Sequence, residues 1–131
     1  MAGHLELDDA PESVSAARHW TEVRAEELGL AAQSPTLTLL VSEMVSNVVL
    51  HARTPCEVRM DRRGESVRIE VRDGSDRLPR VRVLGDPLAQ SGRGMAMVEH
   101  LSAAHGAEPV SGGGKVVWAE VALGSPSAPA P

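Results

Sequence analysis

The stretch LLVSEMVSNVVLHA, residues 39–52, is apolar except for a row of polar side chains. Glu43, Asn47 and His51 recur at every fourth position, so a helix would place them on one face. Apolar residues cover the rest of this helix, namely Leu37, Leu40, Val41, Met44, Val45, Val48 and Val49. We predict that the helix is buried. Its polar row must then face a cavity, a ligand or hydrogen-bonding groups, because unpaired burial of such groups costs several kcal/mol.

Composition predicts one compact domain over residues 1–123, followed by a disordered tail over 124–131. The 131 residues are 42% hydrophobic, which suffices for a single core. A formal net charge of −5, with Arg and Glu interspersed, argues against a nucleic-acid-binding or membrane-binding surface. The lone Cys56 excludes an internal disulfide, and no apolar run reaches the ~18 residues of a membrane span. We expect a cytoplasmic protein.

The pattern of apolar residues and turn residues predicts the order of the elements. We expect an edge strand at 4–8, a helix at 13–28 with Gly29 as its C-cap, a helix from the N-cap Ser34 to about Ala52, a hairpin of strands 57–62 and 66–73, an irregular segment at 74–92, a helix from about Met95 to about Gly106, and a strand at 115–123. This order predicts an α/β (α+β) two-layer sandwich, with helices on one face of a mixed sheet.

Three glycine-containing segments fall where elements change: Asp73-Gly74-Ser75, Gly92-Arg93-Gly94 and Gly112-Gly113-Gly114. In the second, the backbone N–H groups of Gly92, Arg93, Gly94 and Met95 would converge at a helix N-terminus, which favours a phosphate. A tight turn before a helix is the alternative. No P-loop or dinucleotide fingerprint is present, and the five histidines show no metal-ligand spacing.

The order of these motifs resembles the GHKL family, which has the Bergerat ATP-binding fold, and within it the branch of anti-sigma factors and serine/threonine protein kinases. The resemblance covers residues 5–123. LLVSEMVSNVVLHA is similar to the family's N-box, VRIEVRDGS to its adenine-binding segment, SGRGMAMVEHL to its second glycine box, and GGGKVVWAEV to its closing strand.

The resemblance implies roles for individual residues, each with a plainer alternative. Asn47 would bind Mg²⁺ through its side-chain oxygen, or be an Asn hydrogen-bonded among the helices. Glu43 would be the general base that takes the proton of a serine hydroxyl, or simply a surface or salt-bridged Glu. Asp73 would accept a hydrogen bond from the exocyclic amine of adenine, or only cap an Asp-Gly turn. For His51 a cap or a lid contact is expected, with no chemical role.

Two positions depart from the family pattern. Ser75 stands where the first glycine box has its glycine beside adenine, and Lys115 stands where many larger relatives have Thr. The serine would constrain the backbone beside adenine.

The resemblance implies a regulatory protein that uses ATP and Mg²⁺. It would bind a sigma factor, phosphorylate an anti-sigma-factor antagonist protein (an anti-anti-sigma antagonist), and form a homodimer. One alternative is a nucleotide-gated binding module without phosphoryl transfer, in which ATP orders residues 76–91 as a lid. A pure protein-interaction domain with a decayed pocket is the third.

Overall fold

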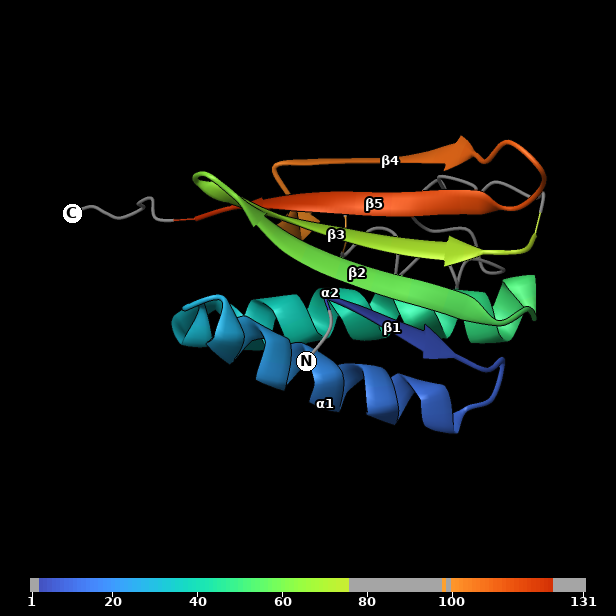
Figure 1. Ribbon diagram of the computed structural model, residues 1–131, viewed down its shortest axis with the longest axis horizontal. Helices are drawn as coiled ribbons and strands as arrows, with labels where there is room; N and C mark the ends of the chain where they lie inside the picture. Colours follow the sequence, from blue (N-terminus) through green and yellow to red (C-terminus); the bar gives the residue numbers. More distant parts are fainter. Residues whose placement is uncertain (1–2, 76–97, 99, 124–131) are drawn as a thin grey trace.

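The chain folds into two layers, with two helices against one face of a five-stranded sheet (Figure 1). The computed structural model describes residues 3–75, 98 and 100–123. The helices are α1 (Glu12–Glu27) and α2 (Ser34–Asn47); the strands, in sheet order, are β1 (His4–Leu7), β2 (Cys56–Arg63), β3 (Ser66–Asp73), β5 (Lys115–Ala122) and β4 (Ala104–Pro109). The predicted two-layer α+β sandwich is confirmed.

All four pairings between neighbouring strands are antiparallel, which corrects the expectation of a mixed sheet. The expectation was wrong because the sequence pattern did not predict strand β4. β4 and β5 form a hairpin, and β5 lies between β3 and β4, so that it runs opposite to both neighbours. The short strand expected at 4–8 is confirmed as the edge strand β1.

The core lies between the sheet and the helices. Along β3, Val67, Ile69 and Val71 are fully buried on the helix side, as their alternation with charged residues predicts. α2 packs beneath β3, and α1 packs beneath β1 and β2. The buried face of α2 is the predicted one, with Leu37, Leu40, Val41, Met44, Val45 and Val48 in the core.

The end of α1 follows the prediction. Gly29 has φ of 76°, the N–H of Leu30 donates to the carbonyl of Ala25 at 2.7 Å, and that of Gly29 donates to Glu26 at 3.0 Å. This pair of hydrogen bonds around a left-handed glycine satisfies the last carbonyls of the helix.

Both ends of α2 differ from expectation. A short 3₁₀ turn, η1 (Ala31–Gln33), leads directly into the helix, so Ser34 lies inside the helix and Gln33 takes the cap position without a side-chain hydrogen bond. After Asn47 the chain continues as a π-helical turn, η2 (Val48–Ala52), in which the N–H of Arg53 donates to the carbonyl of Val48 at 2.8 Å. The helical conformation therefore ends at Ala52, as predicted, but with a wider last turn.

The helix predicted to reach Gly106 ends earlier. Val98, His100 and Leu101 are helical, whereas Ala104–Pro109 is the edge strand β4. Its side chains are exposed or half-buried, so no alternation of apolar residues marked it in the sequence. β4 can pair closely with β5 because residue 106 is glycine. A Cβ on Gly106 would lie 2.8 Å from the Trp118 ring.

Several expectations fall on residues outside the described part of the chain. They are the lid over 76–91, the start of the helix near Met95, the glycine box Gly92-Arg93-Gly94, and the tail over 124–131. Within the described residues, the helices lack the length and apolar character needed to cross a bilayer.

Candidate functional site

Three inward-facing side chains form a row across the end of the sheet where β2 and β5 begin and β3 ends. Cys56, Asp73 and Lys115 are the terminal residues of these strands, and the register places Asp73 directly opposite each of the other two. All three are buried on the side that faces the helices. Strand pairing thus brings together residues that lie far apart in the sequence.

Asp73 and Lys115 form a buried ion pair. The Lys115 Nζ lies 3.0 Å from Oδ1 and 2.9 Å from Oδ2 of Asp73, with side chains 5% and 1% exposed, respectively. Oδ1 also accepts a hydrogen bond from the N–H of Ser75 at 2.8 Å, which is the expected Asp-Gly turn. Sequence reasoning missed the pair, although a lysine at an inward position of an apolar strand was a signal for it.

One oxygen of this carboxylate retains unused hydrogen-bonding capacity. Oδ2 of Asp73 is buried and receives no hydrogen bond, because the nearby ammonium is close enough for charge attraction but not aligned for donation. A buried acceptor without a donor is unfavourable in the absence of a ligand. This oxygen therefore retains the capacity to accept a further hydrogen bond.

Burial and the neighbouring carboxylate both act on Cys56. Loss of solvent contact is the larger cause and the negative charge of Asp73 the smaller one. Together they raise the pKa of the Cys56 thiol to about 11. The thiol therefore stays protonated near neutral pH and is a poor nucleophile. Cys56 is a structural member of this row.

The glycine turn before β5 lets two backbone segments approach closely. Gly112, Gly113 and Gly114 all have positive φ, and a Cβ on Gly114 would lie 2.3 Å from the carbonyl oxygen of Asp73. Only glycine fits at position 114. This third glycine segment of the sequence therefore holds the start of β5 against the end of β3.

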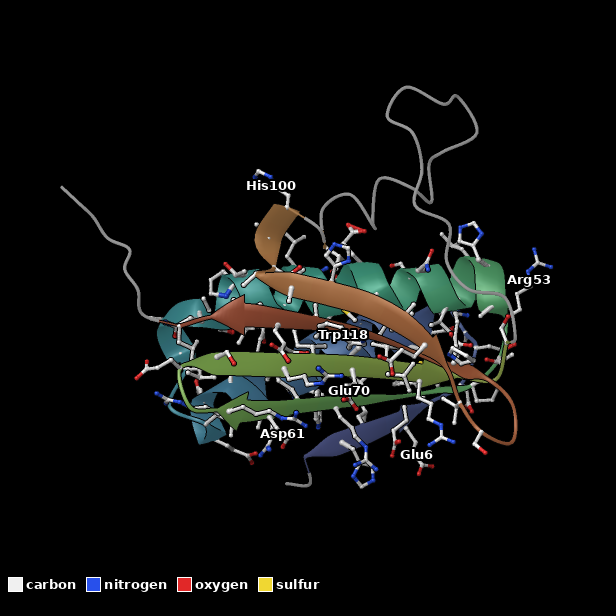
Figure 2. All side chains as sticks on the ribbon, turned by 90° about the horizontal axis from the view of Figure 1, so that it is seen from above. Glu6, Arg53, Asp61, Glu70, His100 and Trp118 are labelled. Carbon is white, nitrogen blue, oxygen red and sulfur yellow. The ribbon has the colours of Figure 1, made fainter. Side chains whose placement is uncertain are left out.

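The end of the α2–η2 helix is connected to the same place. Arg53 adopts the left-handed conformation, with φ of 56°, and turns the chain into β2. The hydroxyl of Thr54 then accepts a hydrogen bond from the N–H of Gly74 at 2.9 Å. Figure 2 shows Arg53 at the tip of this helix, pointing away from the core. The segment after Asn47 is thus fixed to the segment after Asp73.

The polar row of α2 is only partly preserved. Glu43 and Asn47 are half-buried, whereas His51 lies in the π-helical turn and is exposed. Among the described residues, no hydrogen bond or ion pair engages the side chain of Glu43 or of Asn47. The described residues therefore show neither a salt bridge of Glu43 nor a hydrogen bond of the Asn47 side chain among the helices.

Two hollows border these residues. One, of ≈ 630 Å³, lies at the end of the sheet and is lined by Cys56, Asp73, Gly74 and Gly113, among others. The second, of ≈ 930 Å³, is a groove between α1 and α2, where Glu43 lies with Glu22 and Glu26. The structure therefore places Asp73 and Glu43 at two different hollows.

A third group of polar residues lies elsewhere, at the edge of the sheet. His4, Glu6 and Glu57 offer ligand atoms within 4.8 Å of one another, and the His4 Nε2 lies 3.7 Å from Oε2 of Glu57. The spacing of the histidines along the chain could not reveal this group, because pairing of β1 with β2 creates it. Two of its members are exposed, and we assign it no role.

The residues present fit an adenine nucleotide with Mg²⁺. The free acceptor on Asp73 suits an exocyclic amine, and the half-buried Asn47 amide offers the oxygen ligand that Mg²⁺ prefers. The remaining predicted contacts, Gly92, Arg93, Gly94 and Met95, lie outside the described residues. The arrangement can therefore hold a base at the end of β3 and a cation at the end of α2.

Comparison with known proteins identifies the family. The sequence profile of the histidine kinase-like ATPase domain matches residues 7–121, which is nearly the whole chain. No curated protein matches the chain significantly. The match includes the end of α2, the Asp73 turn and β5, and it supports an ATP-binding regulatory function. The chain belongs to the histidine kinase-like ATPase domain family.

Proposed function

We propose that this protein is an ATP-binding anti-sigma regulatory factor with serine/threonine protein kinase activity. The observation that carries the proposal is the state of Glu43 and Asn47, two polar side chains one helical turn apart, half-buried and without protein partners among the described residues. Their side-chain oxygens are therefore available to accept a proton or to bind a cation.

In the proposed reaction, Glu43 accepts the proton of a serine hydroxyl on the partner protein. The serine oxygen forms a bond to the terminal phosphorus of ATP, and the bond between that phosphorus and the bridging oxygen of ADP breaks. Mg²⁺ supplies charge neutralisation of the phosphates when bound, and the side-chain oxygen of Asn47 would be one of its ligands.

The rest of the proposed site binds the nucleotide. Asp73 would accept a hydrogen bond from the adenine amine, with Ser75 holding the carboxylate through its backbone N–H. Gly92, Arg93, Gly94 and Met95 would donate backbone N–H groups to the phosphates. The proposed partners are a sigma factor and an anti-sigma-factor antagonist, and the proposed assembly is a homodimer.

Calorimetric titration with ATP and ADP, each with and without Mg²⁺, tests the site. We expect Mg²⁺-dependent binding of ATP that is lost in Asn47→Ala and retained in the control Ser46→Ala, which changes the neighbouring half-buried residue of α2. Absence of both heat and thermal stabilisation at millimolar nucleotide would contradict the proposal.

Phosphorylation of a purified anti-sigma-factor antagonist, followed by mass spectrometry, tests the chemistry. We expect Glu43→Gln to abolish serine phosphorylation while ATP affinity is unchanged, because the amide cannot accept the proton. A phosphorylation rate in Glu43→Gln equal to the wild-type rate would show that Glu43 is not the base.

The second candidate is a nucleotide-gated binding module without phosphoryl transfer. It is favoured by the position of Glu43 in the groove between α1 and α2, which is a different hollow from the one that Asp73 lines. Under this function, Glu43→Gln would leave the protein's regulatory effect intact, and no serine would be phosphorylated.

A further inference from the structure

We propose that Lys115 reads the base together with Asp73, by donating a hydrogen bond to the ring nitrogen N1 that neighbours the exocyclic amine of adenine. This inference rests on the proposed function, because it concerns the same nucleotide. It makes Lys115 a specificity-determining residue where a single carboxylate was expected to read the base alone.

The hydrogen bonds of the pair are incomplete on both sides. The Lys115 ammonium carries three N–H donors, and among the described residues one of them is used, in the bond to Oδ1 of Asp73. The neighbouring Oδ2 is an acceptor with no donor. Both side chains are at least 95% buried, so water satisfies these groups poorly. A donor and an acceptor thus lie side by side, held by the direct pairing of β3 with β5.

The edge of adenine is complementary to this arrangement. Its exocyclic amine is a donor and its adjacent N1 is an acceptor, so one flat edge can satisfy Asp73 and Lys115 together. The hollow lined by Asp73, Gly74 and Gly113 borders the pair on the Asp73 side, and Lys115 lies behind Asp73 rather than in its lining. Gly114 keeps the backbone of β5 close to that of β3, which fixes the two side chains relative to each other.

A purely structural role for Lys115 is the competing explanation. In that case the ammonium only neutralises the buried carboxylate, and removal of N1 from the base would not change affinity. The two explanations therefore predict different effects of removing N1 from the ligand. Binding measurements on wild-type protein can distinguish them without any variant.

The test compares the affinities of ATP, 1-deaza-ATP, which lacks the N1 acceptor, and purine riboside triphosphate, which lacks the amine. For wild-type protein with Mg²⁺ we expect 1-deaza-ATP to bind about fivefold to tenfold more weakly than ATP, the loss of one hydrogen bond. In Lys115→Met we expect ATP and 1-deaza-ATP to bind equally, while purine riboside triphosphate still binds more weakly than ATP through its lost contact with Asp73.

Equal affinities of wild-type protein for ATP and 1-deaza-ATP would overturn the inference and leave the proposed function standing. Failure to bind ATP at all would overturn the proposed function, and this inference with it. If Lys115→Met does not fold, the double variant Asp73→Asn/Lys115→Met removes the unpaired charge. An N1 penalty that persists in either folded variant would also count against a role for Lys115.

Discussion

Two single residues at the end of the sheet strongly influence the stability of the fold, because they are both buried and charged. Lys115 and Asp73 stabilise each other only as a pair. Charge attraction within the pair offsets the cost of removing each group from water, whereas either group alone would leave an uncompensated buried charge.

We therefore predict that Lys115→Met lowers the free energy of unfolding by about 3–5 kcal/mol, because it leaves the Asp73 carboxylate buried without an opposite charge. The double variant Asp73→Asn/Lys115→Met should regain most of that loss. Urea denaturation of the three proteins measures this. A single variant with the urea midpoint of the wild type would contradict the assignment of a buried ion pair.

Cys56 gives a second prediction at this scale. Its raised pKa means that the folded state holds the thiol proton more tightly than the unfolded chain does. The resulting contribution to stability is complete below the ordinary thiol pKa of 9.0 and is lost as pH rises toward about 11. We expect stability to fall over this interval in wild-type protein and to fall less in Cys56→Ala, as measured by thermal unfolding. At pH 8 the native thiol should resist alkylation, and the urea-unfolded thiol should react.

At the scale of elements, the edge strand β4 depends on one glycine. Gly106 pairs with Trp118 of β5, and the indole ring occupies the space where a side chain at position 106 would lie. Figure 2 looks onto this outer face of the sheet, where Trp118 and Glu70 lie on adjacent strands. The Trp118 ring also stacks against the guanidinium of Arg68, whose Cζ atom is 4.5 Å from the ring centroid.

Gly106→Ala should therefore displace the indole and loosen β4, at a cost of about 1–3 kcal/mol typical of overpacking. Hydrogen–deuterium exchange should rise over 104–109 more than over β2 and β3, and the fluorescence of Trp118 should shift. The exposed Gly113, which has no atom within 4 Å of an added Cβ, is a comparison site for strain from positive φ alone. Unchanged exchange in β4 after Gly106→Ala would contradict this account.

At the scale of the whole molecule, the proposed nucleotide site joins elements from both layers. Asn47 ends α2, while Asp73 ends β3, and the Thr54–Gly74 hydrogen bond links the segments that follow them. A ligand that contacts both would therefore stabilise the packing of the helix layer on the sheet. Binding to the native state alone adds stability in proportion to the logarithm of ligand concentration.

We predict that ATP at about 100 times its dissociation constant stabilises the protein by about 2.7 kcal/mol, and only with Mg²⁺ present. The melting temperature should rise accordingly in wild-type protein and in Ser46→Ala, and it should not rise in Asn47→Ala. An equal rise in the melting temperature of Asn47→Ala would show that Asn47 is not a ligand of Mg²⁺.

The sequence by itself determined the elements whose residues alternate or repeat. The burial of α2, the β2–β3 hairpin and the inward face of β3 follow from spacing, because an apolar side chain must leave water wherever the chain folds. The cap at Gly29 follows from local backbone geometry. The polar residues Glu43 and Asn47 were visible because they interrupt that apolar pattern.

Only the tertiary structure decided which distant residues meet. β4 carries no apolar alternation, and its place at the sheet edge depends on pairing with β5 and on the space beside Trp118. The Asp73–Lys115 pair arises from strand register across 42 residues of chain, and the π-helical conformation of the turn after Asn47 was not predicted either. Such contacts depend on long-range packing, in which the position of each residue is set by neighbours that local spacing does not specify.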